Sequence, residues 1–136
     1  MKIVVVGLGK IGLPLAVQFA GHGHHVIGAD VNPATVQSVR EARPPFPGEA
    51  ELDERLAQVV RAGVLEATTD TAAAVSASDA VVVVVPLYVD GSGEPDFTAI
   101  DAATAAIGAG LRPGTLVTYE TTLPVGTTRN RFGPHL

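Results

Sequence analysis

The sequence predicts a three-layer α/β domain built on a doubly wound parallel sheet. Three short runs, residues 2–6, 80–85 and 115–119, are rich in β-branched residues and mostly apolar at successive positions. Such runs are typical of central strands in a parallel sheet that helices cover on both faces. Segments with helical spacing of apolar residues separate them, and right-handed crossover connections require this alternation of strand and helix.

Local patterns predict the remaining elements. Residues 25–29 and 64–68 are weaker strand candidates that complete a set of five, with the expected order 3-2-1-4-5 and a sixth strand missing or supplied elsewhere. Helices are expected at residues 11–20, from Pro33 behind the cap Asn32, at residues 52–60, after residue 69 or 70, and from Asp96 onward with Phe97, Ile100 and Ile107 facing the sheet.

Size and composition limit the classes of protein to consider. The 136 residues correspond to one domain, 1–136, and the net charge of -5 provides no basic surface for nucleic acid or anionic lipid. No apolar run approaches the roughly 20 residues of a membrane span. The absence of cysteine excludes disulfides and thiolate metal sites and fits a reducing compartment. We therefore expect a cytoplasmic domain without nucleic-acid or membrane partners.

A glycine-rich turn follows the first predicted strand. Gly7, Gly9 and Gly12 have the spacing G-x-G-x-x-G, they precede the first predicted helix, and Asp30 ends the second predicted strand. In this context Gly7 permits a tight turn, Gly9 lets a diphosphate approach the backbone, and Gly12 lets helix and strand pack closely. The pattern indicates a Rossmann-type dinucleotide fold. A strand-turn-helix that binds no nucleotide is the structural alternative.

The same region predicts the cofactor. The amides of residues 9–11 are expected to donate to phosphates at a helix N-terminus, and Asp30 to accept from the adenosine ribose hydroxyls. A carboxylate repels a 2′-phosphate, and no Lys or Arg occurs from Asp30 until Arg40, so the sequence favours NAD over NADP. The predicted cofactor contacts in this region are Gly7, Leu8, Gly9, Lys10, Ile11, Gly12, Asp30, Val31 and Asn32.

Other polar residues carry weaker hypotheses. Lys10 either neutralises a phosphate or points into water, and Glu120 is either a base or a solvated strand end. His22, His24 and His25 lie at the end of a helix beside two glycines, where the helix dipole favours histidine without any metal. No metal site is expected.

The blocks of sequence around these motifs resemble one family. They are KIVVVGLGKIGLPLA at the start, GHHV leading into GAD, GVL with ATTD, SD before the valine run, PD at 95–96, and ETTLPVGTT at 120–128. The last block is similar to E-S-T-V-P-P-G-T-T. In this order, over nearly the whole chain, the blocks resemble the NAD-binding domain of the UDP-glucose/GDP-mannose dehydrogenase family, the nucleotide-sugar 6-dehydrogenases.

The resemblance implies a four-electron oxidation. The C6 alcohol of a UDP- or GDP-linked hexose becomes a carboxylate while two NAD⁺ are reduced in succession, and a cysteine holds the aldehyde stage covalently. Thr122 matches the family threonine that lies near the nicotinamide and helps hold the catalytic water, which makes it the candidate catalytic residue. On this resemblance we also expect Val85, Pro86, Leu87 and Thr122 to contact the cofactor. The structural alternative is that Thr121 and Thr122 cap a helix around residues 125–131.

The sequence also departs from the family pattern. Thr35 replaces a basic residue, Ala50 and Glu51 replace a proline-glycine pair, and residues 85–88 lack the hydroxyl of the block V-x-T-P. The family's cysteine, lysine and asparagine belong to later segments, as do its sugar-nucleotide pocket and its subunit pairing. We therefore expect an isolated or truncated cofactor module that is inactive alone, from a full-length homo-oligomer.

Two rival functions remain open at this point. One is a non-catalytic NAD-binding or sensing module that has lost the catalytic domains. The other is a dehydrogenase domain of the 6-phosphogluconate or hydroxyacid type, which shares the glycine turn. The second rival requires a serine- and glycine-rich stretch near residue 120, where this chain has ETTLPVGTT.

Overall fold

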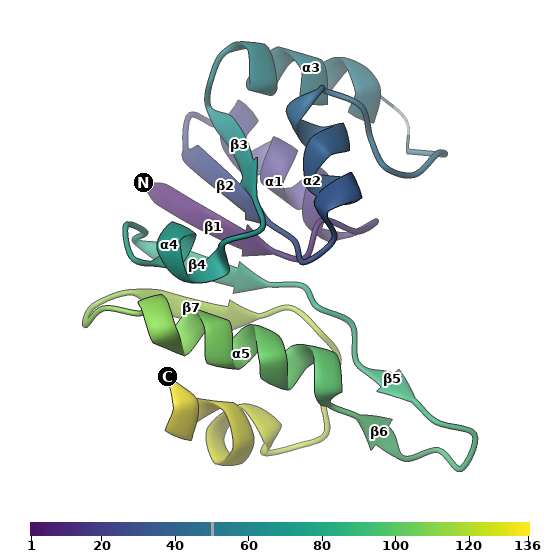
Figure 1. The fold of residues 1–136 in the computed structure, drawn as a ribbon, viewed down its shortest axis with the longest axis vertical. Helices are drawn as coiled ribbons and strands as arrows, with labels where there is room; N and C mark the ends of the chain where they lie inside the picture. Colours follow the sequence, from purple (N-terminus) through teal and green to yellow (C-terminus); the bar gives the residue numbers. More distant parts are fainter. Residues whose placement is uncertain (50) are drawn as a thin grey trace.

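A five-stranded parallel sheet forms the centre of the computed structural model, which describes residues 1–49 and 51–136 (Figure 1). The strand order is β3-β2-β1-β4-β7, so the predicted parallel sheet and its order 3-2-1-4-5 are confirmed. The strands are β1 (Lys2–Val6), β2 (His25–Ala29), β3 (Leu65–Thr68), β4 (Ala80–Val83) and β7 (Leu116–Tyr119).

Helices cover both faces of this sheet and give three layers. The helices are α1 (Gly12–Gly21), α2 (Pro33–Arg40), α3 (Leu52–Arg61), α4 (Thr71–Val75) and α5 (Thr98–Gly110). Successive residues of a strand point to opposite faces. Val5 therefore packs in the core formed with α1, α2 and α3, whereas Val4 packs in the core that includes Val75 of α4 and Ile107 of α5. Both cores are apolar, and their burial is the main stabilising term.

The long connection after β4 differs from the prediction. The strand ends at Val83, earlier than the predicted residue 85, and two short antiparallel strands follow, β5 (Tyr88–Val89) and β6 (Pro95–Asp96). This hairpin was not predicted. It projects away from the main sheet (Figure 1), and Asp90 closes its turn by accepting from the amides of Ser92 and Glu94.

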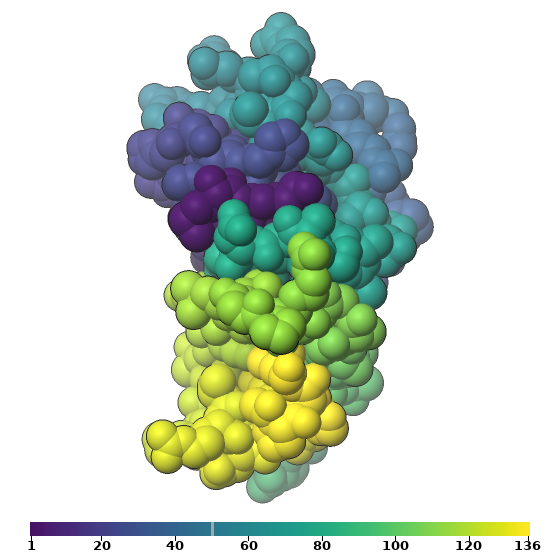
Figure 2. Space-filling model, turned by 90° about the vertical axis from the view of Figure 1, so that its left-hand side faces the viewer, coloured from purple at the N-terminus to yellow at the C-terminus, as the bar shows by residue number. Residues whose placement is uncertain are grey.

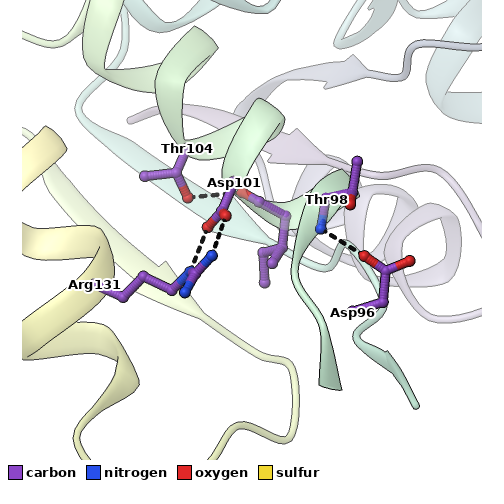
Figure 3. Close-up of polar contacts among 6 residues, drawn as sticks. Asp96, Thr98, Asp101, Thr104 and Arg131 are labelled. Atoms are coloured by element: carbon purple, nitrogen blue, oxygen red, sulfur yellow. Dashed lines mark hydrogen bonds and ion pairs between the residues drawn. The ribbon is translucent and has the colours of Figure 1, made fainter. Parts of the chain in front are cut away.

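Helix α5 begins two residues later than predicted. The Asp96 carboxylate accepts a hydrogen bond from the Thr98 amide at 2.9 Å, so it satisfies one of the free donors at the start of the helix (Figure 3). As predicted, Ile100 and Ile107 are buried. Phe97 lies instead against the C-terminal segment, with its ring 6.4 Å from that of Phe132.

The C-terminal segment is helical but not a regular α-helix. The helix expected around residues 125–131 is a π-helical turn, η1 (Thr128–Phe132), followed by a 3₁₀ turn, η2 (Gly133–His135). This segment forms one end of the molecule, as the yellow atoms of Figure 2 show. Ala50, one of the departures from the family pattern, lies outside the described residues. None of the described helices is long and apolar enough to cross a membrane.

Candidate dinucleotide-binding site

Two of the three motif glycines are required by the fold itself. Gly7 has a φ of +96°, and its amide donates to the Ala29 carbonyl at 2.8 Å, which turns the chain at the end of β1. A Cβ on Gly12 would lie 1.8 Å from the Gly7 carbonyl oxygen. Only glycine permits this turn and this close approach of helix α1 to its strand, as the spacing predicts.

Gly9 occupies a different environment. A Cβ built at Gly9 meets no atom within 4 Å, so neighbouring protein atoms do not explain this glycine. The amides of Gly9, Lys10 and Ile11 donate to no acceptor in the described part of the chain, and α1 has neither a side-chain cap nor an acidic residue in its first turn. The N-terminus of a ten-residue helix therefore presents open donors to solvent, as binding of a diphosphate requires.

Asp30 is held in place beside this turn. Its Oδ2 accepts from the Leu8 amide at 2.8 Å, and its Oδ1 accepts from the Asn32 amide at 2.9 Å. A carboxylate has about four lone-pair positions, so both oxygens keep capacity for further donors. The two backbone bonds orient the carboxylate at the carboxyl end of β2, where a ribose diol would meet it.

Leu8 and Asn32 support the site through contacts within the protein, of which the sequence predicts the cap by Asn32 but not the role of Leu8. The Leu8 side chain is completely buried, and its amide donates to the Asp30 carboxylate and thereby orients it. The Leu8 amide is therefore not available to a phosphate, unlike the amides of residues 9–11. A Cβ on Gly28 would lie 2.7 Å from the Leu8 side chain, so the glycine in β2 makes room for it. Asn32 caps α2 by accepting from the Ala34 amide.

The rim of the site is apolar on both sides of the turn. Ile11 is 67% exposed and Val31 is 88% exposed, and Lys10 is also exposed. Large apolar side chains in water are suited to contact with a flat ring. Arg40, the first basic residue after Asp30, is turned away, because its Nε donates to the Ala67 carbonyl at 2.9 Å. No cation from α2 therefore offsets the Asp30 charge.

The second half of the site lies where β4 and β7 end. Thr121 donates from Oγ1 to the Val85 carbonyl at 2.7 Å, and this bond joins the loop after β7 to the predicted segment 85–87. Thr122 is exposed next to it. The capping alternative for Thr121 and Thr122 is wrong, because the N-cap position of η1 is Thr127. The Glu120 amide donates to the Val83 carbonyl, and its side chain is exposed.

The C-terminal segment fixes the far side of this loop. Phe132 is completely buried, and its ring stacks on Tyr119 with centroids 4.6 Å apart. Arg131 donates to both carboxylate oxygens of Asp101, through Nε to one of them at 2.8 Å (Figure 3). Its guanidinium also lies 4.1 Å from the Phe97 ring centroid. Burial raises the pKa of the Tyr119 hydroxyl, which is hydrogen-bonded to Thr104.

The histidines near α1 do not gather into a site in the structure. The His24 ring lies edge-on to Phe19, with centroids 6.5 Å apart. Across residues 1–49 and 51–136, no group of three or more His, Asp or Glu side chains is placed to hold a metal ion.

A glycine turn with open donors and an oriented acid after β2 define a Rossmann-type dinucleotide-binding domain. Residues 1–135 match the family described as UDP-glucose/GDP-mannose dehydrogenase family, NAD binding domain. The chain belongs to this family, with NAD as its cofactor, and the resemblance drawn from the sequence blocks is confirmed.

Individual relatives support this assignment. The chain is 39% identical over 126 residues to UDP-N-acetyl-D-mannosamine dehydrogenase of Yersinia pestis, and the matched region covers 93% of this chain and 29% of that protein. GDP-mannose dehydrogenase from Pseudomonas aeruginosa is similar in structure, with a TM-score of 0.93 and 30% identity over 99% of this chain and 31% of that one. UDP-glucose dehydrogenase from Pyrobaculum islandicum has a TM-score of 0.91 and 35% identity, and the match covers 98% of this chain and 32% of that one. The chain thus spans about 30% of the length of these relatives.

Proposed function

We propose that residues 1–136 are the coenzyme-binding domain of an enzyme that oxidises the C6 alcohol of a nucleotide-linked hexose to the carboxylate, using two NAD⁺. The family and the named activities of the relatives support this proposal. The observation that carries it is the set of open amides at residues 9–11 beside the oriented carboxylate of Asp30.

The backbone and one carboxylate account for binding at the first half of the site. The amides of Gly9, Lys10 and Ile11 donate to the diphosphate, and the dipole of α1 favours its negative charge. Asp30 accepts from the adenosine ribose hydroxyls, and its negative charge repels a 2′-phosphate. Arg40 does not offset this charge, because its Nε donates to the Ala67 carbonyl. Ile11 and Val31 flank the adenine ring. The exposed Lys10 ammonium adds attraction without a fixed contact.

The second half of the site receives the reactive ring. NAD⁺ supplies a hydride acceptor when bound. Val85, Pro86 and Leu87 line one side, and Pro86 keeps that side rigid because its ring fixes φ. Thr122 is the proposed catalytic residue, since its exposed hydroxyl at the carboxyl end of the sheet can orient a water beside the ring.

The remaining chemistry belongs to parts of a longer protein. The 136 residues contain no cysteine, so a covalent thioester stage requires a thiol from another segment. We propose that such segments also bind the sugar nucleotide and pair the subunits of a cytoplasmic homo-oligomer, and that residues 1–136 alone have no dehydrogenase activity. The match to the UDP-glucose/GDP-mannose dehydrogenase family disfavours the 6-phosphogluconate rival.

Calorimetric titration with NAD⁺ tests the site. We expect Gly9→Val to abolish binding, because the new side chain fills the open space in front of the donors, while the thermal midpoint changes little. Gly21→Val is the matched control, since Gly21 is also exposed and its Cβ also meets nothing within 4 Å. Retained NAD⁺ affinity in Gly9→Val, or equal losses in both variants, would contradict the proposed pose.

A further inference from the structure

The parallel ladder between β4 and β7 stops at a particular bond. The Leu116 amide donates to the Asp79 carbonyl at 3.1 Å, and the Glu120 amide donates to the Val83 carbonyl at 2.9 Å. Donors and acceptors on each strand of a parallel ladder recur every second residue. The next bond in this register would join the Thr122 amide to the Val85 carbonyl.

A side chain makes that bond instead. The Thr121 hydroxyl donates to the Val85 carbonyl at 2.7 Å, which satisfies the acceptor without the Thr122 backbone. Neither the amide nor the hydroxyl of Thr122 has a hydrogen-bond partner within residues 1–49 and 51–136. The residue therefore leaves the sheet one step early and stays exposed.

The neighbouring strand leaves its own ladder at the same level. The Val84 amide donates to the Val6 carbonyl at 2.8 Å, and the next donor position is Pro86, which has no N–H. Thr121 is therefore bonded to a segment that has just left the sheet. Its hydroxyl fixes the distance between the two loops that the proposed function places on either side of the nicotinamide.

We infer that Thr121 is a positioning residue for the nicotinamide half of the site. It acts through Thr122 and the 85–87 segment and requires only a hydroxyl on a short side chain. This inference rests on the proposed function. A purely structural role, that of closing the end of β7, would change NAD⁺ and ADP-ribose binding equally, because ADP-ribose lacks only the nicotinamide.

Titration of three variants with NAD⁺ and with ADP-ribose separates these roles. In Thr121→Val we expect NAD⁺ to bind roughly tenfold more weakly, the scale of one lost hydrogen bond, and ADP-ribose affinity to change less than about twofold. Thr121→Ser should restore the NAD⁺ affinity. Thr115→Val is the matched control, because the Thr115 hydroxyl makes a similar bond, to the Ser78 carbonyl at 3.3 Å, at the opposite end of the same strand pair.

The outcomes distinguish the inference from the function beneath it. If the unchanged protein binds neither ligand, the proposed function fails. If it binds both but does not distinguish them, or if Thr121→Val keeps the advantage of NAD⁺ over ADP-ribose, only the role of Thr121 is overturned. Equal losses for both ligands, or no rescue by serine, would also overturn it. Preferential loss of NAD⁺ with rescue by serine supports it.

Discussion

The two ends of the candidate site are built by different means. At β1 and β2 the backbone itself sets the geometry, through the Gly7 turn and the contact between Gly12 and the Gly7 carbonyl. At β4 and β7 the geometry depends on side chains that meet across long stretches of sequence, such as Thr121 with Val85 and Arg131 with Asp101. We therefore expect the first end to tolerate no side chain at Gly12, whereas the second end should tolerate conservative changes.

The largest expected effect comes from the first end. Gly12→Ala places a methyl group 1.8 Å from the Gly7 carbonyl oxygen, which helix and strand can accept only by moving apart. We expect the free energy of unfolding, measured by urea denaturation, to fall by at least about 3 kcal/mol. Gly9→Ala is the control and should change it by less than about 0.5 kcal/mol. An unchanged urea midpoint for Gly12→Ala would show that the backbone contact does not constrain this end.

A slightly smaller loss of stability is expected at the second end. Phe132→Ala removes a completely buried ring that stacks on Tyr119, and should cost about 3 kcal/mol. Hydrogen exchange should increase mainly over residues 120–136, while ADP-ribose affinity stays unchanged. Phe132→Leu keeps much of the volume and should cost less. If Phe132→Ala lowered the affinity for ADP-ribose but left hydrogen exchange over residues 120–136 unchanged, the two ends of the site would not be structurally independent.

Asp30→Asn tests the charge at the first end, and it also removes one backbone hydrogen bond, because the new amide NH2 cannot accept from the Leu8 or Asn32 amide. Asp30→Asn removes the charge that the Leu8 and Asn32 amides orient, and calorimetry should show NAD⁺ bound about 10- to 100-fold more weakly. NADP⁺ should be affected less, because the repulsion of its 2′-phosphate is relieved. Asp53→Asn removes the same charge from the exposed face of α3 and serves as control. Equal effects on NAD⁺ and NADP⁺ would argue against the ribose contact.

The smallest effect is expected for the ion pair at the second end. Hydrogen bonds from Arg131 hold the pKa of the Asp101 carboxyl below its usual value, although burial opposes this. Because the pKa is lower in the folded state, the ion pair stabilises the fold fully at pH values above the unfolded-state pKa of about 3.9. This stabilisation is lost as the pH falls through the folded-state pKa. Both side chains are nearly half exposed, so the contribution is small and sensitive to salt.

The comparison with Asp101→Asn isolates this contribution. The pKa values of Asp90 and Asp96 are also lowered, chiefly by hydrogen bonds from the Ser92 and Thr98 side chains, so several carboxyls contribute to acid sensitivity. The thermal midpoint of Asp101→Asn should lie slightly below that of the unchanged protein at pH 7 and approach it at pH 3. A difference that grows toward low pH would contradict the sign of the pKa shift.

The residues alone were enough to predict the fold class, the strand order and the glycine turn of the first end. These depend on local patterns: β-branched runs set the strands, and the spacing of Gly7, Gly9 and Gly12 sets a turn within a few residues. Asp30 was also found in this way, because it follows a strand next to that turn. Family resemblance, rather than spacing, selected Thr122.

The contacts that hold the second end could be seen only in the folded protein. Thr121 and Val85 are 36 residues apart and Arg131 and Asp101 are 30 apart, and no local pattern announces such pairs. The hairpin of β5 and β6 is local, since its strands pair within residues 88–96, but strands of two residues are too short to show a recognisable alternation. At the C-terminus a helix was expected, and its irregular form, η1 and η2, was missed because tertiary contacts override weak local propensity. Leu8 illustrates both levels: its position came from the motif, but its burial against Gly28 and its bond to Asp30 required the folded sheet.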